Sequence, residues 1–150
     1  MEIFVDYSFF SLVVVSDGGV APAPIDAWRT AKFGADAGQP AVAGDLADPD
    51  GDGLLNLLEY ALGSDPRTGS ATALPRAELT AGTLTMTYPR NAAATDVALT
   101  VESADALGAF GPASGFTTEE SESLGGVRSV RVSFPANQGA QFVRLRVTRL

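Results

Sequence analysis

The second half of the chain contains four segments in which apolar and polar residues alternate with a period of two. They lie at residues 82–88, 96–102, 128–134 and 142–148. Strict alternation indicates strands with one buried and one solvated face, as in antiparallel sheets. Ala81-Gly82 and Gly125-Gly126 supply turn residues for hairpins. We therefore predict a small antiparallel β-sandwich over residues 75–150. The positions expected to face its core are Leu84, Met86, Tyr88, Val97, Leu99, Val101, Val130, Val132, Phe134, Val143, Leu145 and Val147.

The first half of the chain predicts a short helix at residues 25–33, bounded by a proline and a glycine. Its expected buried side consists of Ile25, Trp28 and Ala31. A lone tryptophan on a short helix is more often part of the core than a platform for a sugar. Residues 35–47 are small and typical of a loop. The predicted fold class is mainly β with a small α segment.

A second helix is predicted at residues 56–62, with Gly63 as its C-cap and Pro66 as the stop. Isolated helices shorter than about 12–15 residues are marginal in water, so this helix needs a packing partner. We expect its leucines to dock on Trp28 and the sheet. These leucines are Leu55, Leu58 and Leu62. The helical part spans residues 24–66.

Residues 1–23 allow two interpretations. The stretch YSFFSLVVV at residues 7–15 has the length of a signal-peptide core, and small residues follow at 21–23. However, the leader carries Glu2 and Asp6 and lacks the basic residues that begin a signal peptide. We favour a β-strand, the end of a preceding domain in a longer chain. A linker rich in glycine and proline then leads to the first helix.

The segment DPDGDGLLNLLE, residues 48–59, places oxygen-bearing side chains at the spacing of a twelve-residue calcium loop. Calcium takes six to eight oxygen ligands at about 2.3–2.6 Å, and alternate residues of a tight loop can point at one centre. Gly53 permits the sharp turn at the sixth position. The predicted calcium ligands are Asp48, Asp50, Asp52, the Leu54 carbonyl, Asn56 and Glu59.

The same residues also suit a capping box, in which Asn56 caps the helix and Glu59 bonds back to it. Capping does not require three aspartates and a glycine in register, and without a cation the four carboxylates would repel one another. Calcium is favoured over magnesium, which prefers strict octahedral geometry and keeps its waters. Asp45 and Asp65 flank the loop as candidate additional ligands, although turn and cap roles are favoured for both.

The net charge of −8 lies in the first half, where residues 1–65 hold eleven acidic and two basic residues. An acidic chain without a basic patch is not expected to bind nucleic acid. With no cysteine and no histidine, disulfides, thiolates and Ser-His-Asp triads are excluded, so any metal must be held by oxygen. No apolar run approaches the length of about 18 residues that a membrane span requires.

The sequence DPDGDGLLNLLEYALGSDP, residues 48–66, resembles the calcium loops of EF-hands, dockerins and thrombospondin type-3 repeats. Together with AWRTAKFG at residues 27–34 and QFVRLRVT at residues 141–148, it is similar to C-terminal accessory modules of large secreted bacterial proteins. The resemblance implies a non-catalytic, calcium-stabilised region. The second loop of paired EF-hands and dockerins is missing from this sequence.

We therefore expect a calcium-binding structural or interaction module of a secreted or surface protein, without enzymatic activity. Its partner would be a protein or a glycan at the cell surface. The alternatives are a carbohydrate-binding module attached to a secreted hydrolase, and a hydrolase with two catalytic carboxylates. The outward positions of the predicted strands are mostly threonine, serine, alanine and arginine, which favours the first interpretation over a sugar-binding face.

Overall fold

The computed structural model describes residues 22–69, 74–104, 110–122, 124–135 and 142–150 of the chain. Its helical elements are α1 (Pro24–Phe33), the 3₁₀ turn η2 (Gly34–Asp36), α2 (Pro40–Ala43) and α3 (Asn56–Leu62). Its strands are β1 (Arg76–Thr80), β2 (Thr83–Asn91), β3 (Val97–Ala104), β4 (Gly111–Pro112), β5 (Thr117–Glu120), β6 (Val127–Pro135) and β7 (Phe142–Arg149). None of these helices is long and apolar enough to cross a membrane, in agreement with the sequence prediction.

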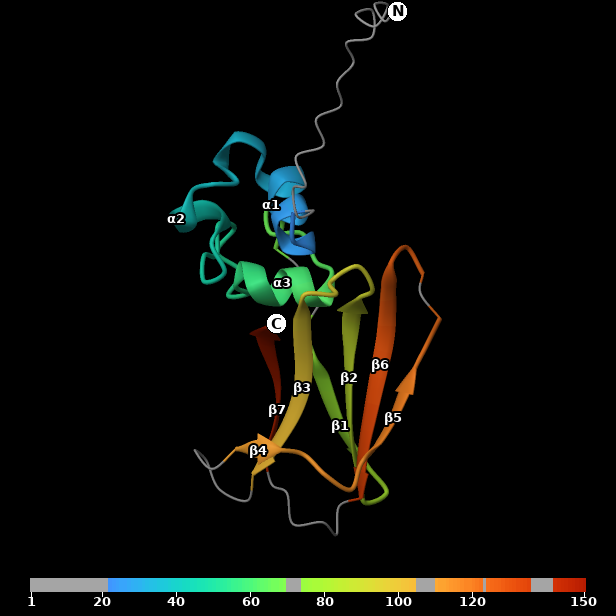
Figure 1. Ribbon diagram of the computed structural model, residues 1–150. Coiled ribbons are helices and arrows are strands. Elements are labelled where there is room, and N and C mark those ends of the chain that lie inside the picture. The colour runs from blue at the N-terminus through green and yellow to red at the C-terminus, as the bar shows by residue number, and fades with distance from the viewer. Residues whose placement is uncertain (1–21, 70–73, 105–109, 123, 136–141) are drawn as a thin grey trace, which may run out of the picture.

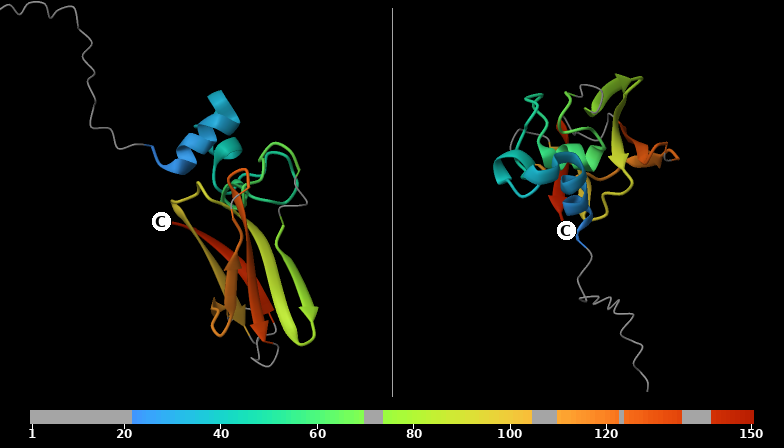
Figure 2. Two further views of the ribbon diagram at one scale, coloured as in Figure 1. Left: turned by 90° about the vertical axis from the view of Figure 1, so that its right-hand side faces the viewer. Right: turned by 90° about the horizontal axis from the view of Figure 1, so that it is seen from above.

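The strands form two antiparallel sheets, one in the order β1-β2-β6-β5 and the other in the order β4-β3-β7. Side chains from both sheets meet in one apolar core, so the fold is a sandwich. The helices gather at one end of it, with α3 closest to the strands (Figures 1 and 2). The predicted fold class, short helices followed by an antiparallel β-sandwich, is confirmed.

The alternating segments correspond to β2, β3, β6 and β7, and their predicted inward faces are confirmed. Seven of the twelve inward positions are buried: Met86, Tyr88, Val97, Val101, Val130, Val132 and Phe134. The others are partly buried and pack against the apolar clusters: Leu84, Leu99, Val143, Leu145 and Val147. The period of two therefore identified the buried face of each long strand.

Strands β1, β4 and β5 were not predicted. Every side chain of β1 and β5 is exposed, so neither strand has a buried face that could produce alternation. Both lie at the edges of the larger sheet and are held by their backbone ladders to β2 and β6. The predicted turn between β1 and β2 is confirmed, because Ala81 and Gly82 adopt φ angles of 48° and 78°. Two successive positive φ angles are typical of the tight turns that join antiparallel strands.

Three predictions about the helical part are wrong. Ala31 is exposed, because at 3.6 residues per turn it lies about 120° around the helix from the buried Ile25. Phe33 is buried instead, with its ring edge against Trp28. Leu55 is 40% exposed, because it precedes the first turn of α3 and does not share its inner face. The region predicted as a loop at residues 35–47 contains most of η2 and all of α2.

Helix α3 joins the helical part to the sandwich through two apolar clusters. Leu62 belongs to the sandwich core and Leu58 packs against it, as predicted. Tyr60 and Ala61 belong to the second cluster, which also contains Ile25 of α1 and residues at the start of β3. Trp28 packs against this cluster with its ring centroid 5.3 Å from that of Tyr60. The short helix is therefore stabilised by tertiary packing.

Asp96, just before β3, connects three segments at this junction. Its carboxylate accepts hydrogen bonds from the backbone N–H of Ile25 at 3.1 Å and from the Tyr60 hydroxyl at 2.5 Å. Burial alone would raise the pKa of Asp96, but these bonds and the nearby charge of Arg149 bring it below its ordinary value. The same environment raises the pKa of Tyr60, through burial first and the Asp96 bond second. The ionised form of Asp96 thus favours the folded state.

Glu102 lies on the polar side of β3, yet it is only 4% exposed. Arg144 donates to one carboxylate oxygen at 2.7 Å and Arg146 to the other at 3.1 Å. These bonds hold the pKa of Glu102 below its ordinary value. The alternation predicted the side of the strand correctly, but it did not predict that two neighbouring arginines would cover the carboxylate.

We expect Asp96→Ala to lower the free energy of unfolding by about 2 kcal/mol, because it removes charge-assisted hydrogen bonds to two segments. Glu78→Ala, on the fully exposed strand β1, is the matched control and should change stability by less than about 0.5 kcal/mol. Urea unfolding of both variants measures the difference. Equal stability of the two variants would show that Asp96 does not hold the junction together.

Candidate metal centre

The loop between α2 and α3 folds around its own aspartates. Asp48 accepts hydrogen bonds from the backbone N–H groups of Gly51 at 2.9 Å and Gly53 at 3.0 Å. Asp50 accepts one from the N–H of Asp52 at 3.2 Å, and Asp52 accepts one from the N–H of Leu54 at 2.8 Å. Gly53 has a φ angle of 92°, which a residue with a side chain rarely adopts. The turn therefore fixes the direction of each carboxylate.

The three aspartates converge. Asp48, Asp50 and Asp52 each offer a carboxylate oxygen, and these oxygens lie within 4.8 Å of one another. Two oxygens bound to one calcium ion at about 2.4 Å can be at most about 5 Å apart, so this spacing fits a shared cation. Exposed acidic groups also gather without metals, so the cluster needs support from its surroundings.

Asn56 supplies such support from the first turn of α3. Its side chain is 1% exposed, and its amide nitrogen donates to the backbone carbonyls of Val42 and Gly44, both at 2.9 Å. These two acceptors assign the orientation of the amide, because only the nitrogen can donate to them. The amide oxygen Oδ1 is then turned away from both carbonyls. It is buried and has no hydrogen-bond partner among the described residues.

Glu59, one turn further along α3, is completely buried. Its Oε1 accepts a hydrogen bond from the Ser64 hydroxyl at 3.1 Å, while Oε2 is buried without a partner in the described part of the chain. Burial raises the pKa of Glu59 to about 7, and the negative charges of the three loop aspartates add to the increase. The Ser64 bond acts in the opposite direction. The charges of all three loop aspartates therefore disfavour the ionised form of Glu59.

A third oxygen, Oδ2 of Asp50, is likewise buried and unpaired within the described residues. A buried polar atom without a partner costs about 1–3 kcal/mol. Carboxylate and amide oxygens without any nitrogen or sulfur ligand are the donors that calcium and magnesium prefer. A cation at this place would coordinate the unpaired oxygens and neutralise the surrounding carboxylates, so the donor set fits a hard divalent ion.

The capping interpretation of Asn56 and Glu59 is wrong. Helix α3 has Leu55 at its N-cap position and no side-chain cap. Its first free N–H groups donate instead to backbone carbonyls, Asn56 to Ala47 at 2.9 Å and Leu57 to Asp45 at 3.1 Å. The Asn56 and Glu59 side chains are therefore not needed to begin the helix.

The predicted ligands occupy three kinds of position. Asp48, Asp50 and Asp52 form the converging group, while Asn56 and Glu59 lie buried at the start of α3. Glu59 is not among the carboxylates within 4.8 Å of one another. Leu54 is 4% exposed, so its side chain packs in the core as expected. The role of its carbonyl as a calcium ligand stays a prediction.

The flanking carboxylates have other partners. Asp45 forms ion pairs with Arg29 and with Arg149, the latter at 3.5 Å. Asp65 accepts a hydrogen bond from Lys32 at 2.8 Å, which holds its pKa below the ordinary value. It also accepts one from the backbone N–H of Arg67 at 3.1 Å, which confirms the turn role expected for it. Both carboxylates are thus part of the framework around the loop.

Sequence reasoning missed the residues that orient the buried oxygens. Ser64 and the carbonyls of Val42 and Gly44 lie outside the twelve-residue pattern. The glycine at position 44 is the one sequence signal for this turn, because a Cβ atom there would lie 2.3 Å from the carbonyl oxygen of Pro40. Only glycine lets the chain turn so tightly after α2 and present its carbonyl to Asn56.

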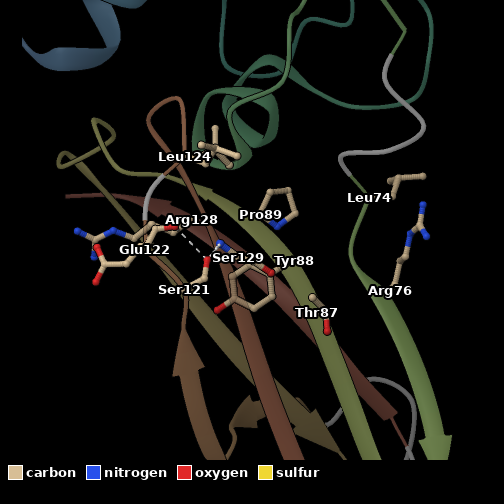
Figure 3. A pocket seen from close by; sticks show the side chains of 11 residues that line it. Leu74, Arg76, Thr87, Tyr88, Pro89, Ser121, Glu122, Leu124, Arg128 and Ser129 are labelled. Carbon is tan, nitrogen blue, oxygen red and sulfur yellow. Dashed lines mark hydrogen bonds between the residues drawn. The ribbon is translucent and has the colours of Figure 1, made fainter.

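A separate hollow of about 490 Å³ lies on the larger sheet (Figure 3). Leu74 and Arg76 border one side, Ser121 and Ser129 the other, and Pro89 lies between them. Glu122 is the one carboxylate among the described residues that line it. The paired carboxylates of a glycosidase-type site are therefore not found in this hollow.

Comparison of the chain with protein-family models, with curated proteins and with solved structures found no match. The resemblance to calcium-loop modules therefore stays a prediction, and the candidate centre rests on the chain's own residues.

The pKa of Glu59 predicts how the metal-free protein responds to pH. The folded chain holds Glu59 protonated up to about pH 7, whereas an unfolded chain releases this proton near 4.5. Between these values the folded state binds more protons, so its stability falls as the pH rises. The loss amounts to roughly 3 kcal/mol. Urea unfolding of metal-free protein at about pH 5 and about pH 8 measures it.

Glu59→Gln should remove this part of the pH dependence, and Glu119→Gln on exposed β5 should keep it. Identical pH dependence in Glu59→Gln and the unaltered protein would contradict the burial of an uncompensated carboxylate.

Proposed function

We propose that the chain is a non-catalytic calcium-binding module of a secreted or surface protein, in which one ion stabilises the fold. The proposed ligands are Asp48, Asp50, Asp52, the Leu54 carbonyl, Asn56 and Glu59. The observation that carries the proposal is the pair of buried oxygens on Asn56 and Glu59 that have no hydrogen-bond partner among the described residues, in the segment that directly follows three converging aspartates. Buried polar groups normally have partners, and a calcium ion would be a partner for both.

Calcium suits this donor set better than magnesium does. The set mixes exposed and buried groups from a loop and a helix, and it includes an amide and a predicted backbone carbonyl. Calcium accepts six to eight oxygens in flexible geometry, whereas magnesium demands near-octahedral coordination and retains water. A protein cage of up to six residues therefore favours calcium.

The position of the ligands supports a structural role. Glu59 precedes Tyr60 and Ala61 of the second apolar cluster, and Leu62 belongs to the sandwich core. An ion bound to Asn56 and Glu59 would fix the first turn of α3, which has only seven residues. That turn sets the direction in which α3 presents its core residues. The ion would thus stabilise the contact between the helical part and the sandwich, in a chain without cysteine.

We also propose that the chain works outside the cell. Calcium modules of extracellular proteins bind the ion with dissociation constants of about 10⁻⁴–10⁻³ M, and the four carboxylates here favour this range or somewhat tighter binding. The resemblance to accessory modules of secreted bacterial proteins points the same way.

Isothermal titration calorimetry tests the site directly. We expect one calcium ion per chain, and a loss of affinity of at least about tenfold in Asp50→Asn because one ligand charge is removed. Glu119→Gln removes a charge from exposed β5 and should bind like the unaltered protein. The absence of calcium heat from the folded protein, or equal binding by Asp50→Asn, would refute the site.

A further inference from the structure

Strand β7 has a free edge. It is the last strand of the order β4-β3-β7, and no described strand pairs with its other side. In Figure 1 it lies on the outer side of β3. The free side of an edge strand carries unpaired backbone groups that can bind another extended chain. Proline, which often protects such edges, is missing from β7, and only Arg149 at its end places a charge on the inward side of this strand.

The pairing pattern shows which backbone groups face this edge. The carbonyl of Val101 accepts a hydrogen bond from the N–H of Ala113, on the β4 side of β3. Val101 lies opposite Leu145, so this pair makes no hydrogen bonds between β3 and β7. The N–H and carbonyl groups of Leu145, and by alternation those of Val143 and Val147, therefore point away from β3.

A hollow of about 590 Å³, lined mostly by apolar residues, adjoins this strand, and Asp45, Arg144 and Arg146 also line it. Leu145 and Val147 of β7 line it on one side, and Leu46, Leu55 and Leu58 line it from the helical part. Leu46 is 78% exposed and Leu55 is 40% exposed, so this apolar surface is open to solvent. It can receive apolar side chains from a chain that lies along β7.

The charge of the strand indicates the kind of chain that fits. β7 carries three arginines and no acidic residue, although the protein as a whole has a net charge of −8. Arg144 and Arg146 share one carboxylate, that of Glu102, and their side chains are 50% and 56% exposed. The polar face of β7 is therefore locally positive. An added strand would place its own polar side chains beside these arginines.

We propose that the free edge of β7 binds an extended segment of another protein in which apolar residues alternate with carboxylates. The segment adds a strand to the sheet through the backbone groups of Val143, Leu145 and Val147. Its apolar side chains enter the hollow lined by Leu46 and Leu55, and its carboxylates lie beside the arginines. A second copy of this chain fits less well, because pairing β7 with itself would set arginines against arginines. None of the proposed calcium ligands lines this hollow, although Leu55 lies between two of them in the chain.

Two peptides of about eight residues, the length of β7, test the proposal. One alternates valine with glutamate and the other alternates valine with lysine. The glutamate peptide should bind at least about tenfold more tightly, because its charge complements the arginines. Amide NMR should show the largest shifts at Val143, Leu145 and Val147. Leu46→Glu should weaken binding of the glutamate peptide at least about tenfold, by placing a charge in the hollow.

Leu124→Glu is the matched control, because Leu124 is 88% exposed and lies beside the larger sheet. It should bind the peptide like the unaltered protein. The titrations are made in excess calcium, with calcium binding measured separately. If the protein binds calcium but not the glutamate peptide, the docking proposal is wrong and the proposed calcium site is unaffected. Equal binding of the two peptides would overturn the docking proposal as well. The proposal would also be overturned if the protein self-associates and Leu46→Glu abolishes that self-association, because a second copy of the chain would then occupy the edge of β7.

Discussion

Two buried oxygens that have no hydrogen-bond partner in the described part of the chain set the main physical constraint on this fold. Oδ1 of Asn56 and Oε2 of Glu59 lie in the first half of α3, directly after a loop in which three aspartate carboxylates converge. Unpaired polar atoms and like charges both destabilise a folded protein when nothing compensates them. The raised pKa of Glu59 follows from its burial and from the three loop charges, and the Ser64 hydrogen bond offsets only part of the increase. A divalent cation would compensate the oxygens and the charges together.

The rest of the structure depends on how α3 is held. The seven residues of this helix carry two proposed ligands and also residues of both apolar clusters. Its end is equally constrained, because Gly63 has a φ angle of 85° and a Cβ there would lie 2.8 Å from Val127. The carbonyl of Tyr60 accepts a hydrogen bond from Asn91 of β2, and its hydroxyl bonds to Asp96. Electrostatics in the loop and packing in the sandwich therefore act on the same helix.

The sequence predicted what depends on local periodicity and spacing. Alternation identified the four strands with a buried face, and the aspartate spacing identified a cluster that the structure brings together. Alternation could not predict β1 and β5, which bury no side chain. The orientation of the Asn56 amide could not be predicted either, because it depends on two backbone carbonyls near α2. That region has no clear alternation of apolar and polar residues. The ion pairs of Glu102 required knowledge of which strand lies beside β3.

The most direct test of the central claim is thermal unfolding in excess calcium and in metal-free buffer. The fluorescence of Trp28, whose ring packs against that of Tyr60, monitors the transition. A ligand that binds only the folded state at a hundredfold excess over its dissociation constant stabilises it by about 2.7 kcal/mol. For a chain of this size, that corresponds to a rise in melting temperature of about 5–10 °C. Magnesium should give a smaller rise, and Asp50→Asn should lose most of it. An identical melting temperature with and without calcium would contradict the account, because the loop would then not stabilise the fold through a metal.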